Sequence, residues 1–203
     1  FGQFALARLY REGKGLVGDE KKAEELFGQC LRGMQELAEK GDAEAQCNLG
    51  QMYEAGFGIK KDLDLAVKWY KAASAGSGAR GIYHMGVMLR HGRGLWKNET
   101  EAVSLYRRSG EMGYAPAQRA IGFMLQWGIG TPKSLDEAFT WYQKAAEQGY
   151  PPGLESLGYM YYEGWGTKKN GPQAEKLFRQ ATALGDANAL QLLGTLDNYG
   201  VQK

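Results

Sequence analysis

The chain has 203 residues, of which 43% are apolar, enough to build a hydrophobic core without help from metals or disulfides. Its 25 Lys and Arg residues nearly balance 23 Asp and Glu residues, and the net charge near +2 disfavours binding to nucleic acid or acidic lipid. No stretch of the sequence approaches the roughly 18 consecutive apolar residues that predict a membrane span.

Glycine is over-represented, with 30 residues where usual composition of ~7% would give about half as many. The chain also has 12 Tyr, 7 Phe and 5 Trp residues, and such large side chains are rare in disordered proteins. The glycines are therefore expected to punctuate regular structure, which indicates a repeat protein.

The repeat is visible without gaps in four segments, CNLGQMYEAGFGIKKD, YHMGVMLRHGRGLWKN, RAIGFMLQWGIGTPKS and ESLGYMYYEGWGTKKN. A column glycine recurs every 36 residues, at Gly50, Gly86, Gly122, Gly158 and Gly194. An earlier copy, ALARLYREGKGLVGD, places Ala7 in this column 43 residues before Gly50, so the first unit carries about seven extra residues, expected in its second helix. We predict one domain over 1–203, with units at about 1–41, 42–76, 77–113, 114–149 and 150–185 and a partial unit at 186–203.

Each unit is predicted to contain two helices. Apolar residues such as Ala45, Leu49 and Met52 lie on one face of the first helix, as do Ala117, Ile121 and Met124 in a later unit. The second helix follows a side chain able to cap its free amides: Asp19, Asp62, Asn98, Ser134 or Asn170. The fold class is therefore all-α, a right-handed α/α superhelix of eleven helices in which each unit packs on its neighbours.

Two sets of glycines are expected to shape this repeat. The column glycines should let neighbouring helices approach closely, because they lack a side chain. A second set follows the second helix, where a left-handed residue is favoured. Its members are Gly41, Gly113, Gly149 and Gly185, and the second unit departs from them, with Gly76 and Gly78 on either side of the column.

The pattern A-x-x-x-L-G-x-x-Y-x-x-G-x-G, followed by A-x-x-W-Y-x-K-A-A-x-x-G, resembles Sel-1-like repeats, which are relatives of the tetratricopeptide repeat. The best matches are LGQMYEAGFGIKKDLDLAVKWYKAA and SLDEAFTWYQKAAEQG. The resemblance covers essentially the whole chain. It implies an α/α solenoid that recruits other proteins, as in adaptors, signalling scaffolds and bacterial secretion, virulence or immunity proteins, and it implies no catalytic residues.

Residues that could carry other chemistry do not converge. The G-x-G segments lie between predicted helices in every unit, so we expect turns rather than phosphate loops. His84 and His91 are seven residues apart and lack further ligands, so we expect surface side chains and no metal. Cys30 and Cys47 should be offset by roughly 7 Å along antiparallel helices, which argues against a disulfide. We expect no cofactor and no enzyme.

A variable face is predicted opposite the core in each first helix, at −3, +1 and +4 from the column glycine, and it should line the concave side. Its polar ends are Cys47, Gln51 and Glu54 in one unit and Gln191, Thr195 and Asn198 in another. Its middle is rich in aromatic residues and arginine, the composition of binding hot spots. The predicted partner-binding residues are Tyr83, Val87, Arg90, Arg119, Phe123, Gln126, Glu155, Tyr159 and Tyr162.

The function predicted from these residues is that of a scaffold or adaptor that binds a partner protein or peptide in this groove. An inhibitor or immunity protein that wraps a toxin or enzyme is the alternative. The rings could instead be buried between first helices as part of the core. If the groove were not the binding site although the fold stays intact, Trp96, Phe57 and Trp165 on the loops would be the next candidates. Neither end resembles a polar capping repeat, so we expect a longer protein or self-association. The compartment stays open, with an extracytoplasmic one (periplasm or secretory lumen) favoured over the cytoplasm.

Overall fold

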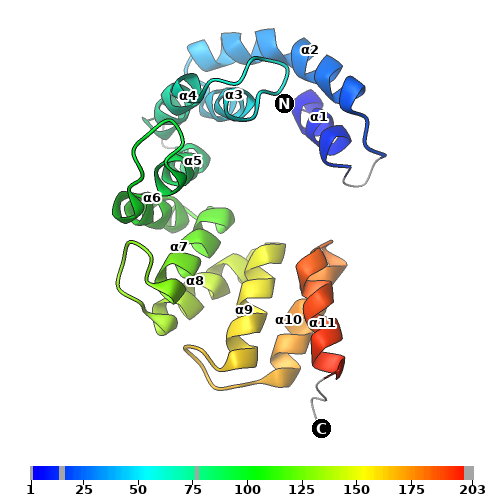
Figure 1. Ribbon diagram of the computed structural model, residues 1–203, viewed down its shortest axis with the longest axis vertical. Helices are drawn as coiled ribbons and strands as arrows, with labels where there is room; N and C mark the ends of the chain where they lie inside the picture. The colour runs from blue at the N-terminus through cyan, green and yellow to red at the C-terminus, as the bar shows by residue number, and fades with distance from the viewer. Residues whose placement is uncertain (1, 14–16, 76–77, 199–203) are drawn as a thin grey trace. The chain divides into compact units, whose positions relative to one another are not determined.

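The structure, a computed structural model, describes residues 2–13, 17–75 and 78–198. Within that part of the chain it contains eleven helices and no strands, and 76% of the described residues are helical, which confirms the all-α prediction (Figure 1). Of the positions singled out above, Gly76 and the side chains of Thr195 and Asn198 lie outside this description. The helices are α1 (Gly2–Glu12), α2 (Glu20–Glu39), α3 (Ala43–Ala55), α4 (Leu63–Ala75), α5 (Ala79–His91), α6 (Glu99–Glu111), α7 (Ala115–Trp127), α8 (Leu135–Glu147), α9 (Pro151–Glu163), α10 (Gly171–Ala183) and α11 (Ala187–Asn198).

The helix boundaries follow the predicted period. From the second repeat onward the first helices begin at Ala43, Ala79, Ala115, Pro151 and Ala187, which are 36 residues apart as predicted. Helix α2 has 20 residues where the other second helices have 13, so the extra residues of the first repeat do lengthen this helix.

The second helices begin where the capping residues predict. Backbone amides of the first turn donate to the side chains of Asp19, Asp62, Ser134 and Asn170, over 2.9, 3.0, 3.4 and 3.1 Å. Each of these bonds satisfies an amide that has no partner inside the helix. Local sequence alone therefore sets where these helices start.

The molecule divides into two compact units, Phe1–Asn98 with α1 to α5 and Glu99–Lys203 with α6 to α11, and each is described by itself. Within each unit every helix packs on the next in the chain, and first helices also touch one another, α3 with α5 and α7 with α9. Whether the two units form the single predicted domain stays a prediction.

The predicted core is buried in both units. Ala45, Leu49 and Met52 of α3 are fully buried, as are Ala117, Ile121 and Met124 of α7. The second helices contribute a bulky ring in the same column, namely Tyr70, Tyr106, Tyr142 or Phe178. Burial of these apolar faces between neighbouring helices is the main force that holds each stack together.

The column glycine leaves room for that bulky ring. A Cβ atom built on Gly122 would lie 2.7 Å from Cε1 of Tyr142, closer than real Cβ contacts allow. Gly50 stands in the same relation to Tyr70, and Gly158 to Phe178, also at 2.7 Å. The expected close approach is therefore a contact between the first helix and the second helix of the same repeat.

The G-x-G segments form turns, as predicted. Gly128 and Gly130 have φ values of 67° and 65°, in the left-handed region that favours glycine. The Gly128 amide closes the end of α7, and Gly130 packs against the backbone of Glu99 at the start of α6. The glycines that follow second helices, Gly41, Gly113, Gly149 and Gly185, also have positive φ, whereas Gly78 does not.

Candidate functional site

The variable face of the second unit surrounds a hollow of about 260 Å³. Neighbouring first helices supply most of its wall, because α7 and α9 pack side by side. Five of the six partner-binding residues predicted in this unit line it, and Tyr162 does not. The lining residues are Arg119, Phe123, Gln126, Trp127, Tyr142, Glu155, Ser156, Tyr159 and Leu192.

Five rings at one edge of this hollow form what we call the aromatic cluster: Phe123, Trp127, Tyr159, Tyr162 and Trp165. Ring centroids are 6.5 Å apart for Phe123–Trp127 and 6.0 Å for Trp127–Trp165. The distances are 5.5 Å for Tyr159–Trp165 and 6.5 Å for Tyr159–Tyr162. The two contacts that Trp165 makes are close to perpendicular, at 89° and 78°, so its ring is not stacked on either partner.

Trp127 is the member of the cluster that sequence reasoning missed. It ends α7 and keeps 53% of its surface exposed, which is high for the largest apolar side chain. A signal for it did exist in the full repeats, where the equivalent residues are Glu12, Ala55, His91 and Glu163 and none is an aromatic ring, whereas the final partial unit has Tyr199 in this column. A large ring in a column of small or polar residues suggests a role other than packing.

The three loop residues named as alternative binding residues lie in different environments. Trp165 belongs to the aromatic cluster, so the groove and loop hypotheses share this residue. Phe57 stacks on Phe27 of the core at 4.9 Å and is half-buried. Trp96 is 95% exposed on the loop before α6.

Gln126 is not an open surface residue as predicted. It is only 7% exposed, and its Oε1 accepts a hydrogen bond of 2.7 Å from the buried hydroxyl of Tyr142. The same bond joins the Tyr70 hydroxyl to Glu54, also at 2.7 Å, so the +4 position supports a buried tyrosine in both of these repeats. The equivalent of Tyr142 in the last full repeat is Phe178, which has no hydroxyl, and Tyr162 stands at +4 there.

Arg119 and Glu155, two residues of opposite charge, both line the hollow. The Arg119 Nε donates to Ser156 Oγ over 3.4 Å. Burial raises the pKa of the half-buried Glu155 carboxyl, and the nearby Asp186 carboxylate raises it further, against smaller opposing effects of Arg119 and Asn188. Burial likewise raises the pKa of the Tyr159 hydroxyl, with a contribution from the Glu163 carboxylate. Glu155 is therefore a carboxylate that a nearby cation would stabilise.

In the first unit the variable face carries a network of polar side chains instead. Gln51 accepts from Arg80 over 2.7 Å and lies 3.0 Å from His84 Nε2, and Arg80 forms an ion pair with Glu44 at 2.7 Å. Cys47, in the same face, is buried. The groups of this face thus bond largely to one another.

His84 is not at the surface as predicted. It is half-buried, and its ring stacks on Tyr70 with centroids 4.8 Å apart and planes 5° apart. Burial, with the charges of Arg80 and Arg8, lowers its pKa from 6.5 to about 3. His84 is therefore a neutral part of the packing, whereas His91 is exposed as predicted.

The remaining predicted binding residues, Tyr83, Val87 and Arg90, lie on α5 in the first unit and are half-buried. The Tyr83 ring meets His84 edge-on, with centroids 5.3 Å apart. These residues therefore border the polar network of that unit.

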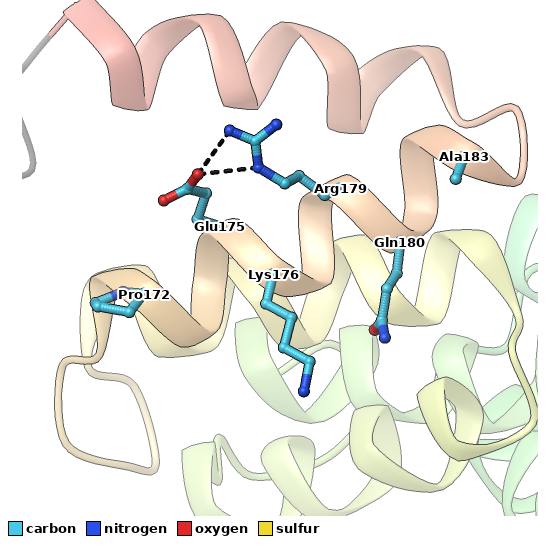
Figure 2. A pocket seen from close by; sticks show the side chains of 6 residues that line it. All are labelled: Pro172, Glu175, Lys176, Arg179, Gln180 and Ala183. Atoms are coloured by element: carbon cyan, nitrogen blue, oxygen red, sulfur yellow. Dashed lines mark hydrogen bonds and ion pairs between the residues drawn. The ribbon is translucent and has the colours of Figure 1, made fainter.

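A second hollow, of about 500 Å³, follows the outer side of α10 (Figure 2). A single helix lines it, and the Glu175 carboxylate there is bound by Arg179 over 2.7 and 2.9 Å. Its lining contains no aromatic ring, and its one carboxylate is already paired with Arg179. This surface offers little to a partner.

Across the described residues, no group of three or more His, Cys, Asp or Glu side chains is arranged to hold a metal ion. No helix in the described ranges is long and apolar enough to span a membrane. Cys30 and Cys47 are free thiols, and Cys30 Sγ donates to the carbonyl of Phe27 over 3.3 Å.

Comparison with known proteins agrees with this architecture. The Sel1 repeat model matches residues 1–29, 43–77, 79–114, 115–150 and 151–186. The chain belongs to the Sel1 repeat family. The first Sel1 match stops at residue 29, inside the lengthened helix α2.

Solved structures with the same fold come from several bacteria. A protective antigen of uropathogenic Escherichia coli strains is 28% identical with a TM-score of 0.72, and the match covers 99% of this chain but 42% of that protein. A Sel1 repeat protein from Oxalobacter formigenes is 25% identical with a TM-score of 0.73, covering 96% of this chain and 64% of that protein. The chain thus spans less than two thirds of either relative. Among curated proteins, the comparison found no match.

An immunity protein from Pseudomonas aeruginosa also shares the fold, at 23% identity and a TM-score of 0.59, with 93% of this chain and 69% of that protein covered. Sel1 repeat proteins generally mediate interactions between proteins, and their fold is typically a non-catalytic scaffold.

Proposed function

We propose that this Sel1 repeat chain is a scaffold that binds a segment of a partner protein on the variable face of its second unit. The observation that carries the proposal is the aromatic cluster, whose ring of Trp127 is half exposed beside a hollow. Monomeric soluble proteins seldom expose a contiguous apolar patch unless it makes a contact. Trp, Tyr and Arg are also the residues that dominate binding energies in interfaces.

The six predicted residues of the second unit divide into three roles under this proposal. Phe123, Tyr159 and Tyr162 act as anchors for the partner together with Trp127 and Trp165. Arg119 and Glu155 supply charge at the floor of the hollow, and Gln126 supports Tyr142 from within. Tyr83, Val87 and Arg90 in the first unit remain predicted binding residues.

The inhibitor or immunity hypothesis stays the alternative. The immunity protein named above is 23% identical, and at that level the likeness concerns the fold alone. A partner that is itself a toxin or an enzyme inactivated by this chain would favour the alternative, whereas a partner whose activity is unchanged would favour a scaffold.

The proposal can be tested by affinity capture from lysate of the cells that make the protein, followed by binding measurements with the captured partner after purification. Replacing Phe123 and Tyr159 together by Ala should weaken binding by more than about 30-fold for each anchor lost, equivalent to about 2 kcal/mol. Trp96→Ala is the matched control, because Trp96 is an exposed ring outside the cluster.

If the double variant keeps full affinity and Trp96→Ala loses it, the variable face is not the binding site. The loop residues would then be the better candidates for binding. Should the double variant unfold, the rings would belong to the core, and Trp127→Ala then provides the test, because its ring is more than half exposed. Circular dichroism of each variant separates these outcomes.

A further inference from the structure

We propose that the hollow beside the aromatic cluster receives an arginine or lysine side chain from the partner segment. This inference rests on the proposed function and adds the chemistry of the guest. It follows from the shape of the hollow, the sign of the charges around it and two internal examples of the same arrangement.

The hollow has the two surfaces that a long basic side chain requires. Phe123, Tyr159 and Leu192 give it apolar walls, and Glu155 places a carboxylate among them. Arg and Lys bury an apolar stem while keeping a charged head group at a polar site. The volume of about 260 Å³ suits one such side chain rather than a whole helix.

Charges around the hollow favour a cation. After burial, the Asp186 carboxylate contributes to the raised pKa of Glu155, and the Glu163 carboxylate contributes to that of Tyr159. The guanidinium of Arg119 also lines the hollow and opposes the effect on Glu155. An acidic guest would meet the Glu155 carboxylate, which lines the hollow. Lys168 and Lys169 follow Trp165 on the loop but are exposed, so solvent and salt screen their charges.

The aromatic rings favour the same guest. The face of an aromatic ring carries partial negative charge and attracts Lys or Arg within about 6 Å, most strongly for Trp. Because Trp165 meets Trp127 and Tyr159 close to perpendicular, none of these pairs is stacked face to face. The Trp127 ring is 53% exposed and lines the same hollow as Glu155, so a cation there can combine a ring contact with the Glu155 carboxylate.

The chain itself uses this combination twice. Arg11 lies 4.5 Å from the centroid of the Phe57 ring and forms an ion pair with Glu24. In the second unit Arg107 lies 6.0 Å from the centroid of the Trp141 ring and forms an ion pair with Glu137. In both cases an arginine contacts an aromatic ring and forms an ion pair with a glutamate of a second helix. In the hollow, the first helices α7 and α9 supply the rings and the glutamate, and the partner would supply the cation.

The experiment is selection of a random dodecapeptide library displayed on phage against the intact chain. Parallel selections use Glu155→Gln, Glu175→Gln and Phe123→Ala/Trp127→Ala. Glu175→Gln is the matched control, because this carboxylate lies outside the hollow and is paired with Arg179 (Figure 2). Wild type and Glu175→Gln should enrich peptides with one Arg or Lys flanked by apolar residues, and Glu155→Gln should lose the basic preference.

A synthetic peptide from the wild-type selection then gives a double-mutant cycle. Replacing its basic residue by Gln should weaken binding to the wild-type chain at least tenfold and should change binding to Glu155→Gln by less than threefold. Peptides that depend on the cluster but contain no basic residue would overturn this inference and leave the proposed function intact. Absence of any peptide that depends on the cluster would overturn the proposed function itself.

Discussion

The two units fill the same repeat columns with different chemistry. In the first unit, positions around the column glycines carry Gln51, Glu54 and His84, which bond to Arg80, to Tyr70 and to each other. In the second unit the corresponding region carries Phe123, Tyr159 and Tyr162, which make ring contacts with tryptophans. The helical frame beneath is the same in both, with helix starts 36 residues apart.

This contrast teaches that a constant core leaves the variable face free to diverge. Polar groups that bond within one face have their hydrogen-bonding capacity used internally, so they gain little from a partner. Apolar rings beside a hollow gain free energy when a partner covers them. The second unit is therefore the better candidate for binding, although both units have the same fold.

The largest effect should come from breaking the frame that both units share. Gly122→Leu should destabilise the chain by about 3 kcal/mol, the upper end of the usual cost of overpacking, because even a Cβ atom would lie 2.7 Å from Tyr142. Gly194→Leu is the control, since nothing lies within 4 Å of a Cβ atom built there. Chemical denaturation measures both, and equal costs would show that the glycine column has another cause.

A smaller effect is expected where the variable face supports the core. Gln126→Leu should cost about 2 kcal/mol, because it leaves the buried Tyr142 hydroxyl without an acceptor. Adding Tyr142→Phe should recover most of this loss, since it removes the hydroxyl. Tyr162→Leu, at the equivalent position beside Phe178, should cost less than Gln126→Leu. If Tyr142→Phe fails to rescue stability, packing rather than the hydrogen bond explains the role of Gln126.

The polar face of the first unit predicts a dependence on pH. Burial and the charges of Arg80 and Arg8 hold the pKa of folded His84 at about 3, against 6.5 for an unperturbed group, so the unfolded chain binds a proton first as pH falls. The contribution of neutral His84 to the free energy of unfolding is therefore fully present above pH 6.5. Below this pH the free energy of unfolding falls, by up to about 1.4 kcal/mol per pH unit. Thermal or denaturant unfolding between pH 7 and 5 should show a steeper loss in wild type than in His84→Gln. Parallel curves for the two proteins would contradict a buried, neutral His84.

The smallest effects should be equal in the two units. Asp62→Ala and Asn170→Ala each remove one cap hydrogen bond at the start of a second helix, of 3.0 and 3.1 Å. Each should lower the free energy of unfolding by about 1 kcal/mol. A large difference between the two variants, measured by chemical denaturation, would show that the units are not built on equivalent frames.

The sequence by itself determined the repeat, the helix starts and the core. These features depend on local rules: a turn of 3.6 residues places Ala45, Leu49 and Met52 on one face, and a side-chain oxygen at Asp62 caps the next helix. The lengthened α2 followed from a count of residues between Ala7 and Gly50. Five predicted binding residues also proved to line one hollow, because the face of a helix follows from the same period.

Only the tertiary structure decided which residues of that face serve the core. Gln126 bonds to Tyr142, 16 residues along the chain, and Gln51 meets His84, 33 residues along. Trp127 joins Trp165 through the packing of α7 beside α9. Such contacts depend on the distance and angle between neighbouring helices, which result from how bulky rings such as Tyr142 fit against column glycines. Helical periodicity fixes the direction of a side chain around its own helix but carries no information about what the adjacent helix places there.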